Sequence, residues 1–468
     1  EYSLKKSEKK ERGTEIILHI SKDSKDYLEE NKISELLNKY NKFMPHPIKF
    51  GTKEETIPGK EGEKEEKVTI DNIINNPNPA WTKTPADLKD EDYKQFYREL
   101  YPYQFEEPLF HIHLNVDYPF NLTGILYFPK ISNDLNLQKD RIQLYQNQVF
   151  VTDNVEGIVP EFLGLLKGVI DSPDIPLNVS RSYLQSDASV KKITNYITRK
   201  VADKLNSIFK NERENLESKW NDIKVVIEYG MLTEDKFYDK AESFNLYPTV
   251  DDKYLTYEEL EKKIKKLQTD KDGNLIILYA QNKDEQHTYI ESAKEKGYEV
   301  LLLDSPIIPH LMQKLESKKE KIKFSRVDSD TLENLIKKDE EVISKLTDEE
   351  KEKLKPMIET AVENEKYTVQ LEALDSNSMP FMLAQPEFMR RMKEMQQTGG
   401  GAMGNLPDMY SLIVNTNHEL VGKILNTRTE KKRNSLIKQS IDLAKLSQNN
   451  LTGKDLTEFI NRSIDLIK

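Results

Sequence analysis

Residues 149–185 read VFVTDNVEGIVPEFLGLLKGVIDSPDIPLNVSRSYLQ, and this stretch decides the fold. Its bulky first residues predict a strand, which runs into the acidic turn 153–156. Pro160 favours the start of a helix, because a helix leaves its first N–H groups unsatisfied and proline has none. Pro173 and Pro176 then predict an irregular loop, which ends in the segment 177–185.

Upstream residues predict a sheet with helices. Two strands are expected within residues 109–128, joined by a turn at 118–121, and residues 142–153 continue the sheet. Helices are expected from Ile33 to Tyr40 and from Asp87 to Leu100. Residues 13–20 alternate well enough for a strand, and residues 51–69 form a charged loop or hairpin.

Downstream, a long and broken helix is predicted from Ser189 to Trp220. Residues 275–279 and 300–303 are uninterrupted apolar runs, as in strands covered on both faces, and a helix over 284–297 would join them into a parallel unit. The predicted class is therefore α/β: a middle region of several subdomains, comprising an α/β sandwich, connecting helices and a smaller α/β/α unit, followed by an α+β C-terminal domain.

Composition excludes several classes of protein. The 468 residues are 37% hydrophobic and 32% charged, which indicates a folded and heavily charged protein of about three domains. The net charge of −11 argues against nucleic acid as the main partner. With no cysteine, disulfides and thiolate zinc sites are excluded. No apolar run is long enough to span a membrane, and the first residues do not resemble a signal peptide.

Common catalytic motifs are also absent. The sequence has neither of the usual glycine-rich phosphate loops and no G-x-S-x-G hydrolase motif. His111 and His113 would share one face of a strand, but no acidic partner lies near them, so we expect a packed or solvated pair and no metal site. The chain by itself does not read as a common enzyme.

The motifs in 149–185 closely resemble the middle domain of the ninety-kilodalton heat-shock-protein family of chaperones. The resemblance is carried by D-x-x-E-x-I-V-P-E, K-G-V-I-D-S and L-N-V-S-R-x-x-L-Q. It extends to residues 12–16, to Ala80-Trp81-Thr82 and to 412–418. It implies a bacterial-type chaperone whose ATP-binding domain is not in this sequence. The implied parts are a charged linker remnant (1–12), a large middle subdomain (13–225), a small α/β subdomain (226–340) and a C-terminal dimerisation domain (345–468).

By this resemblance, Arg181 reaches the γ-phosphate of ATP, which the absent domain would bind together with Mg²⁺. A guanidinium keeps its charge and can stabilise phosphoryl oxygens, so hydrolysis would depend on the domains closing. Gln185 lies one helical turn further on and would assist, and Asn178 would order the loop. The alternative for all three is a structural role in capping a helix that begins near Ser180.

The resemblance also implies surfaces for non-native client proteins. Phe388, Met389, Met392 and Met395 lie on one side of a predicted helix, and methionine suits a surface that accepts varied partners. The alternative is a buried core stripe. Trp81, flanked by prolines, is the second candidate for client binding, and here the alternative is packing against Phe96.

Two amphipathic helices end the chain and are predicted to pair with their copies in a homodimer. The residues assigned to dimerisation are Leu436, Ile437, Ile441, Leu456, Phe459, Ile460 and Ile464. The alternative is packing within one chain only. If dimerisation is confined to these helices, removing the residues after 427 should leave a folded monomer.

Two other functions remain open. One is the corresponding region of another ATPase of the same superfamily, such as a type II topoisomerase or a mismatch-repair protein, and the other is a dimeric scaffold without a catalytic role. The acidic charge and the L-N-V-S-R motif disfavour the first of these. The expected location is the bacterial cytoplasm, with a mitochondrial relative as the alternative.

Overall fold

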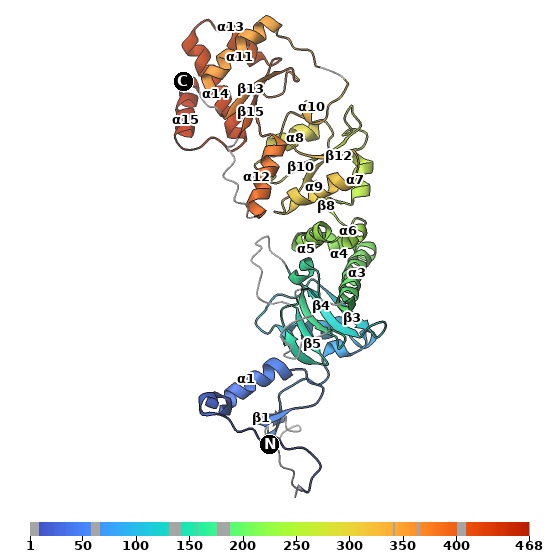
Figure 1. Cartoon of the computed structure of the whole chain (residues 1–468). Coiled ribbons are helices and arrows are strands. Elements are labelled where there is room, and N and C mark those ends of the chain that lie inside the picture. The colour runs from blue at the N-terminus through green and yellow to red at the C-terminus, as the bar shows by residue number, and fades with distance from the viewer. Residues whose placement is uncertain are drawn as a thin grey trace. The chain divides into compact units, whose positions relative to one another are not determined.

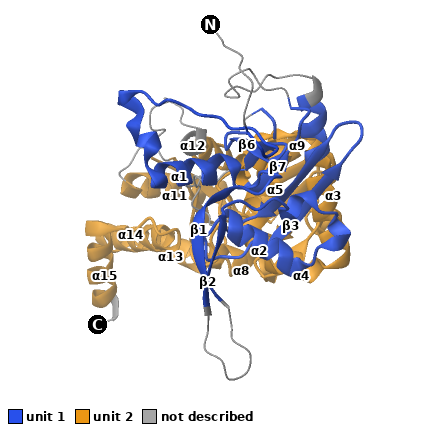
Figure 2. Ribbon diagram, turned by 90° about the horizontal axis from the view of Figure 1, so that it is seen from below, with its two compact units in different colours: residues 1–129, 138–159, 166–197 blue, residues 130–137, 160–165, 198–468 orange. Residues whose placement is uncertain are grey.

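The computed structural model describes residues 9–57, 66–130, 142–155, 157–175, 188–339, 342–362, 366–399 and 409–467 (Figure 1). The chain forms two compact units (Figure 2). Unit 1 contains residues 1–129, 138–159 and 166–197, and unit 2 contains residues 130–137, 160–165 and 198–468. The boundary falls inside a helix, whereas the sequence places one near residue 225. The four-part division stays a prediction.

Unit 1 is built on a five-stranded sheet in the order β3-β4-β7-β5-β6, in which only β5 and β7 pair in parallel. Its strands are β3 (Phe110–Val116), β4 (Leu122–Phe128), β5 (Gln143–Gln146), β6 (Val149–Thr152) and β7 (Lys167–Asp171). Gly168 allows β4 and β7 to approach closely, because a Cβ at this position would lie 2.0 Å from the carbonyl oxygen of Ile125. The predicted sheet is confirmed.

Unit 1 contains further elements besides this sheet. They are α1 (Glu30–Asn41), the antiparallel hairpin of β1 (Lys49–Ile57) and β2 (Glu66–Ile73), α2 (Asp90–Leu100) and the start of α3 (Ala188–Asn211). Short 3-10 turns cover Lys22–Leu28, Ala80–Thr82 and Pro85–Asp87. His111 and His113 are packed, as expected: Tyr93 stacks on His111 with 3.8 Å between ring centroids, and its hydroxyl lies 2.9 Å from His113 Nδ1.

Two local predictions are wrong. Residues 14–20 form no strand, and Ile16, Ile17 and Leu18 are 69–79% exposed. No described strand pairs with this segment, and an extended chain needs such a partner to satisfy its backbone groups. The helix expected after Pro160 is only a 3-10 turn at Glu161–Leu165, which lies in unit 2.

Unit 2 begins with helices and continues into an α/β part. The helices are the rest of α3, α4 (Arg213–Ser218), α5 (Trp220–Thr233) and α6 (Asp235–Ala241). A parallel sheet follows in the order β11-β10-β12, which confirms the predicted unit. This part contains β8 (Tyr247–Pro248), β9 (Tyr254–Leu255), α7 (Tyr257–Ile264), β10 (Leu275–Ala280), α8 (His287–Glu295), β11 (Val300–Leu302), α9 (Ile308–Lys318), β12 (Ile322–Arg326) and α10 (Leu332–Leu335).

The C-terminal part of unit 2 is α+β. Its sheet has the order β13-β15-β14, with β13 parallel and β14 antiparallel to β15. The elements are α11 (Asp348–Val362), β13 (Tyr367–Glu372), β14 (Phe381–Ala384), α12 (Glu387–Gly399), β15 (Tyr410–Asn415), α13 (Glu419–Asn426), α14 (Glu430–Ser447) and α15 (Gly453–Ile467). The mixed α/β class predicted from the sequence is confirmed.

Candidate functional site

The segment that leads to Arg181 is anchored at its start. β7 ends at Asp171, whose Oδ2 accepts hydrogen bonds from Trp81 Nε1 at 3.3 Å and from the backbone N–H of Gln148 at 2.8 Å. Burial raises the pKa of Asp171, and these two donors act against the rise. Next along the chain, Asp174 Oδ2 accepts from the N–H of Asn121 at 2.6 Å.

The three residues assigned to the ATPase, Arg181, Gln185 and Asn178, lie outside the described residues. On either side of the stretch that contains them, Ile175 is 1% and Val190 3% exposed. Both flanks are therefore fixed in the core of unit 1. The role of Arg181 stays a prediction.

The prediction that Trp81 is exposed is wrong, because its ring is fully buried. It contacts Phe43, Phe96 and Tyr145, with ring centroids 4.7, 5.4 and 5.2 Å away. The prolines around it do shape a loop without regular helix, but the loop folds inward. Packing against Phe96, the alternative considered above, is what the structure shows, so Trp81 is not available as an anchor for clients.

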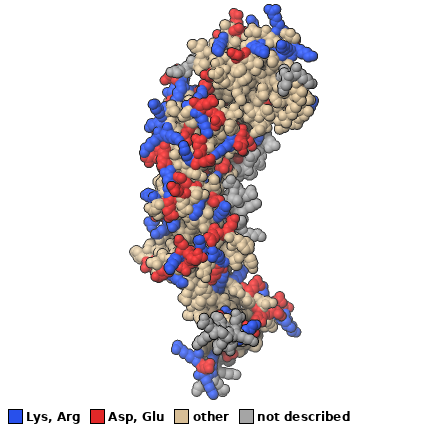
Figure 3. Space-filling model, turned by 180° about the vertical axis from the view of Figure 1, so that it is seen from behind, with Lys and Arg blue, Asp and Glu red and all other residues tan. Residues whose placement is uncertain are grey.

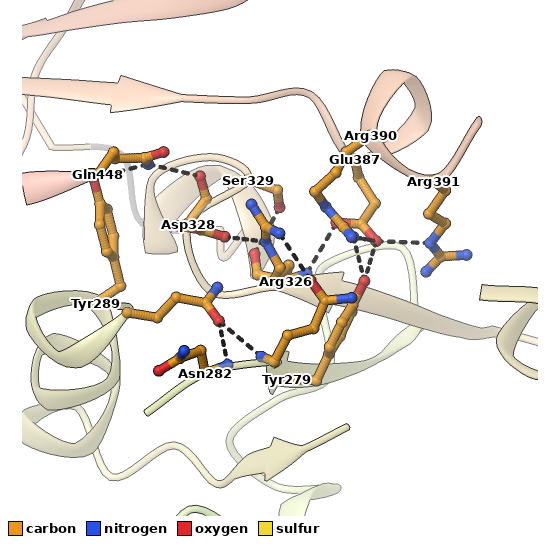
Figure 4. Close-up of polar contacts among 12 residues, drawn as sticks. Tyr279, Asn282, Tyr289, Arg326, Asp328, Ser329, Glu387, Arg390, Arg391 and Gln448 are labelled. Atoms are coloured by element: carbon orange, nitrogen blue, oxygen red, sulfur yellow. Dashed lines mark hydrogen bonds and ion pairs between the residues drawn. The ribbon is translucent and has the colours of Figure 1, made fainter. Parts of the chain in front are cut away.

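Helix α12 presents its charged side to the α/β part of unit 2. Four residues at helical spacing form this charged stripe: Glu387, Arg390, Arg391 and Glu394. Arg390 is 3% exposed and Arg391 14% at the side chain. Figure 4 shows how this stripe meets side chains from β10 and β12.

Glu387 lies at the centre of these contacts. Its Oε1 accepts from Tyr279 Oη at 2.8 Å, from Arg390 Nη2 at 2.5 Å and from Arg391 Nε at 2.7 Å. Its Oε2 accepts from the backbone N–H of Arg326 at 3.1 Å. Although burial alone would raise the pKa of Glu387, the charges of Arg390 and Arg391 hold it below the ordinary value, so the side chain is an anion.

Arg391 ties the same stripe to α9. Its Nη1 donates to Glu316 Oε2 at 2.8 Å, and its Nη2 donates to the carbonyl oxygen of Phe324 at 2.6 Å. Burial works to lower the pKa of Arg391, but Glu316 and Glu387 raise it above the usual value. The helix is therefore held by charge-assisted hydrogen bonds from two neighbouring elements.

The predicted client residues lie on the other side of α12. This apolar stripe consists of Phe388, Met389, Met392 and Met395. Phe388 is 68% exposed, and none of the three methionines is buried. Phe388 is therefore not a core residue, and the three methionines are only partly covered. The charged stripe of α12 is packed against the protein, with Arg390 buried, whereas on the apolar side Phe388 is exposed and the three methionines are partly covered.

A second contact joins the C-terminal and α/β parts of unit 2. Gln448, just after α14, donates through Nε2 to the carbonyl oxygen of Leu383 at 2.5 Å and to Tyr289 Oη at 3.0 Å. Tyr289 Oη in turn donates to the same carbonyl oxygen at 3.2 Å. Figure 4 shows Gln448 beside Tyr289 and Asp328. This contact lies near the end of β14, four residues before α12 begins.

The comparison with known families decides the identity of the chain. A family model described as Hsp90 protein matches residues 51–462. The chain belongs to the Hsp90 family. It is 47% identical to the chaperone protein htpG of Bacteroides fragilis, in an alignment covering 100% of this chain and 78% of that protein. It is 51% identical to the chaperone protein HtpG of Porphyromonas gingivalis, over 95% of this chain and 65% of that protein.

More distant relatives match as well. The chaperone protein HtpG of Myxococcus xanthus is 30% identical over 65% of this chain and 46% of that protein. The resemblance found in 149–185 therefore identified the Hsp90 family correctly, and the topoisomerase and mismatch-repair alternatives are set aside.

The residues assigned to dimerisation divide between a core and a surface of this Hsp90 chain. Ile437 and Ile441 lie in the core beneath the β13-β15-β14 sheet, and Leu436 packs against it. Placing Ile437 and Ile441 at a dimer surface is wrong, because these two side chains close the core of this part, whereas for the partly buried Leu436 the assignment stays a prediction. For the same reason, removing all residues after 427 is not expected to leave a folded C-terminal part.

Helix α15 differs, since Ile460 and Ile464 are 47% and 48% exposed. Leu456 and Phe459 are partly exposed on the same helix. On α14, Leu443 and Leu446 are also 47% and 40% exposed. Apolar side chains at i and i+4 that remain open to solvent on a strongly amphipathic helix indicate a surface that another molecule covers.

On the molecular surface, acidic and basic side chains are mixed. Figure 3 shows acidic and basic side chains interspersed over the face that it draws, without a broad basic area. Among the residues with a described structure, no helix is both long and apolar enough to cross a membrane.

Sequence reasoning missed the groups that hold α12, namely Tyr279, Glu316 and Arg326. The spacing 387, 390, 391 and 394 was the available signal. This spacing shows that the charged residues form a stripe of their own on the helix. It cannot show whether the charged or the apolar stripe packs against the rest of unit 2.

Proposed function

We propose that this chain is the part of an ATP-driven molecular chaperone that forms the dimer, holds non-native client proteins and completes the ATPase site of a nucleotide-binding domain. The observation that carries the proposal is the family match over residues 51–462, together with 47–51% identity to proteins named as HtpG chaperones. The bacterial cytoplasm is the proposed location.

In this proposal ATP and Mg²⁺ are bound by a domain outside this sequence, and the chain supplies Arg181. A guanidinium brought in from a second domain would stabilise the charge on the phosphoryl oxygens only when the two domains meet. The motif L-N-V-S-R-x-x-L-Q at residues 177–185 supports this role, because it resembles the family's motif around this arginine. Gln185 and Asn178 would assist from the same segment.

Clients would be held by the apolar stripe of α12. Phe388 supplies a largely exposed aromatic ring, and the methionines can adapt to different partners because their side chains are flexible and polarisable. Trp81 has no part in this surface.

The dimer would form through the exposed apolar faces of α14 and α15. Changing both Ile460 and Ile464 to glutamate is expected to turn a dimer into a monomer and to raise its dissociation constant at least about 100-fold, because two carboxylates would be buried in an apolar interface. Sedimentation of the full chain over a range of concentrations measures this.

The matched control is Lys454→Glu on the same helix, where the side chain is 87% exposed. It should leave the dimer intact. A double variant that is still folded by circular dichroism and still sediments as a dimer would show that the interface lies elsewhere.

A further inference from the structure

We propose that Glu387 is a positioning residue that fixes the charged stripe of α12 to the α/β part of unit 2 and thereby turns the apolar stripe outward. The inference rests on the client surface proposed above and names the group that creates it. Three observations carry it: the inward-facing charged stripe with Phe388 exposed on the other side, the number of donors on one carboxylate, and the origin of those donors.

The orientation of α12 buries charged side chains, and the free-energy cost of this burial can be offset only by polar partners. Arg390 is almost fully buried, and burying an unpaired charge would be strongly unfavourable. Its Nη1 is 2.6 Å from Glu394 Oε1, and its Nη2 contacts both Glu387 and the hydroxyl of Tyr279. These contacts allow the charged stripe to face inward and leave the apolar stripe toward solvent.

Glu387 has a position that no other acidic residue of the stripe has. Four donors converge on its two oxygens, and they come from β10, from the end of β12 and from α12 itself. It is also the first residue of the helix, where the helix dipole favours a negative charge. One carboxylate therefore joins the start of α12 to both strands.

The charges of this cluster nearly balance. Arg326, Arg390 and Arg391 face the carboxylates of Glu316, Asp328, Glu387 and Glu394, as their ion pairs show. Three positive charges thus meet four negative ones. Neutralising Glu387 would remove the one carboxylate that Arg390 and Arg391 share, and removing one partner of a buried pair is more harmful than removing both.

The test compares Glu387→Gln with the unchanged 468-residue chain. Hydrogen exchange at the backbone amides of residues 390–395 should become at least about tenfold faster, because the helix is no longer held and opens locally. Global unfolding by denaturant should change much less than this local exchange. The matched control is Glu349→Gln, an exposed glutamate in the first turn of α11, which should change neither.

The second readout is binding of a permanently unfolded probe, reduced and carboxymethylated α-lactalbumin. Glu387→Gln should weaken its binding at least about fivefold, since a helix that must be ordered on binding loses affinity. Phe388→Ala should weaken binding as well but leave the amide exchange of α12 unchanged.

The outcomes separate the inference from the proposed function. Unchanged exchange in Glu387→Gln overturns the positioning role. The role is also overturned if Glu387→Gln shows faster amide exchange but binds the probe normally, while Phe388→Ala binds the probe less tightly. If Phe388→Ala binds the probe normally, the proposed client surface is wrong, and Glu387 then has no role in presenting it. Faster amide exchange in Glu387→Gln would still establish that Glu387 holds the helix.

Discussion

Arg181→Ala is expected to lower ATP turnover by a factor of about 100 or more in a protein that joins this chain to an ATP-binding domain from an Hsp90 relative. The affinity for ATP should stay nearly unchanged. The reason is that a guanidinium from a second domain acts on the charge that develops during phosphoryl transfer, whereas the nucleotide-binding domain holds ATP in the ground state.

The measurements are the turnover number and, separately, the dissociation constant of ATP. Arg199→Ala, an exposed arginine on α3, is the matched control and should change neither. Loss of ATP binding with normal turnover per bound ATP would contradict the assigned role. Unchanged turnover would favour the alternative of a dimeric scaffold without a catalytic link.

Trp81→Ala is expected to destabilise unit 1 by about 4 kcal/mol, within the range found when a buried aromatic residue is cut back to alanine. The change opens a cavity among Phe43, Phe96 and Tyr145 and also removes a donor from the buried carboxylate of Asp171. Unfolding by urea, followed by circular dichroism, measures the loss of stability.

Tyr103→Ala is the matched control, because Tyr103 is 90% exposed in the same unit. It should change stability by less than about 0.5 kcal/mol. A Trp81→Ala protein that unfolds at the same urea concentration as the unchanged chain would mean that the indole is not part of the core, and the client-binding role would then be open again.

The sequence predicted those strands whose burial follows from a simple local pattern of apolar residues. The apolar runs at 275–279 and 300–303 predicted the parallel strands β10 and β11, since strands covered on both faces need continuous apolar residues. Residues 109–128 predicted β3 and β4 because two strand-forming stretches flank a turn at 118–121.

Other features depend on distant partners and could not be predicted. Trp81 is buried by Phe43 and Tyr145, which no local pattern connects to it. The orientation of α12 depends on Tyr279, more than 100 positions before the helix. Residues 14–20 show the opposite error: their alternation is typical of a strand, but no described strand lies beside them to complete a sheet.

The most direct test of the central claim, that α12 presents its apolar stripe to client proteins, is photocrosslinking at position 388. A benzoylphenylalanine placed there in the full chain should form an adduct with carboxymethylated α-lactalbumin, because Phe388 is exposed and has been assigned to the client surface. The same group at Tyr103, which is even more open to solvent, should give little adduct. Efficient crosslinking at position 103 and none at 388 would contradict the claim.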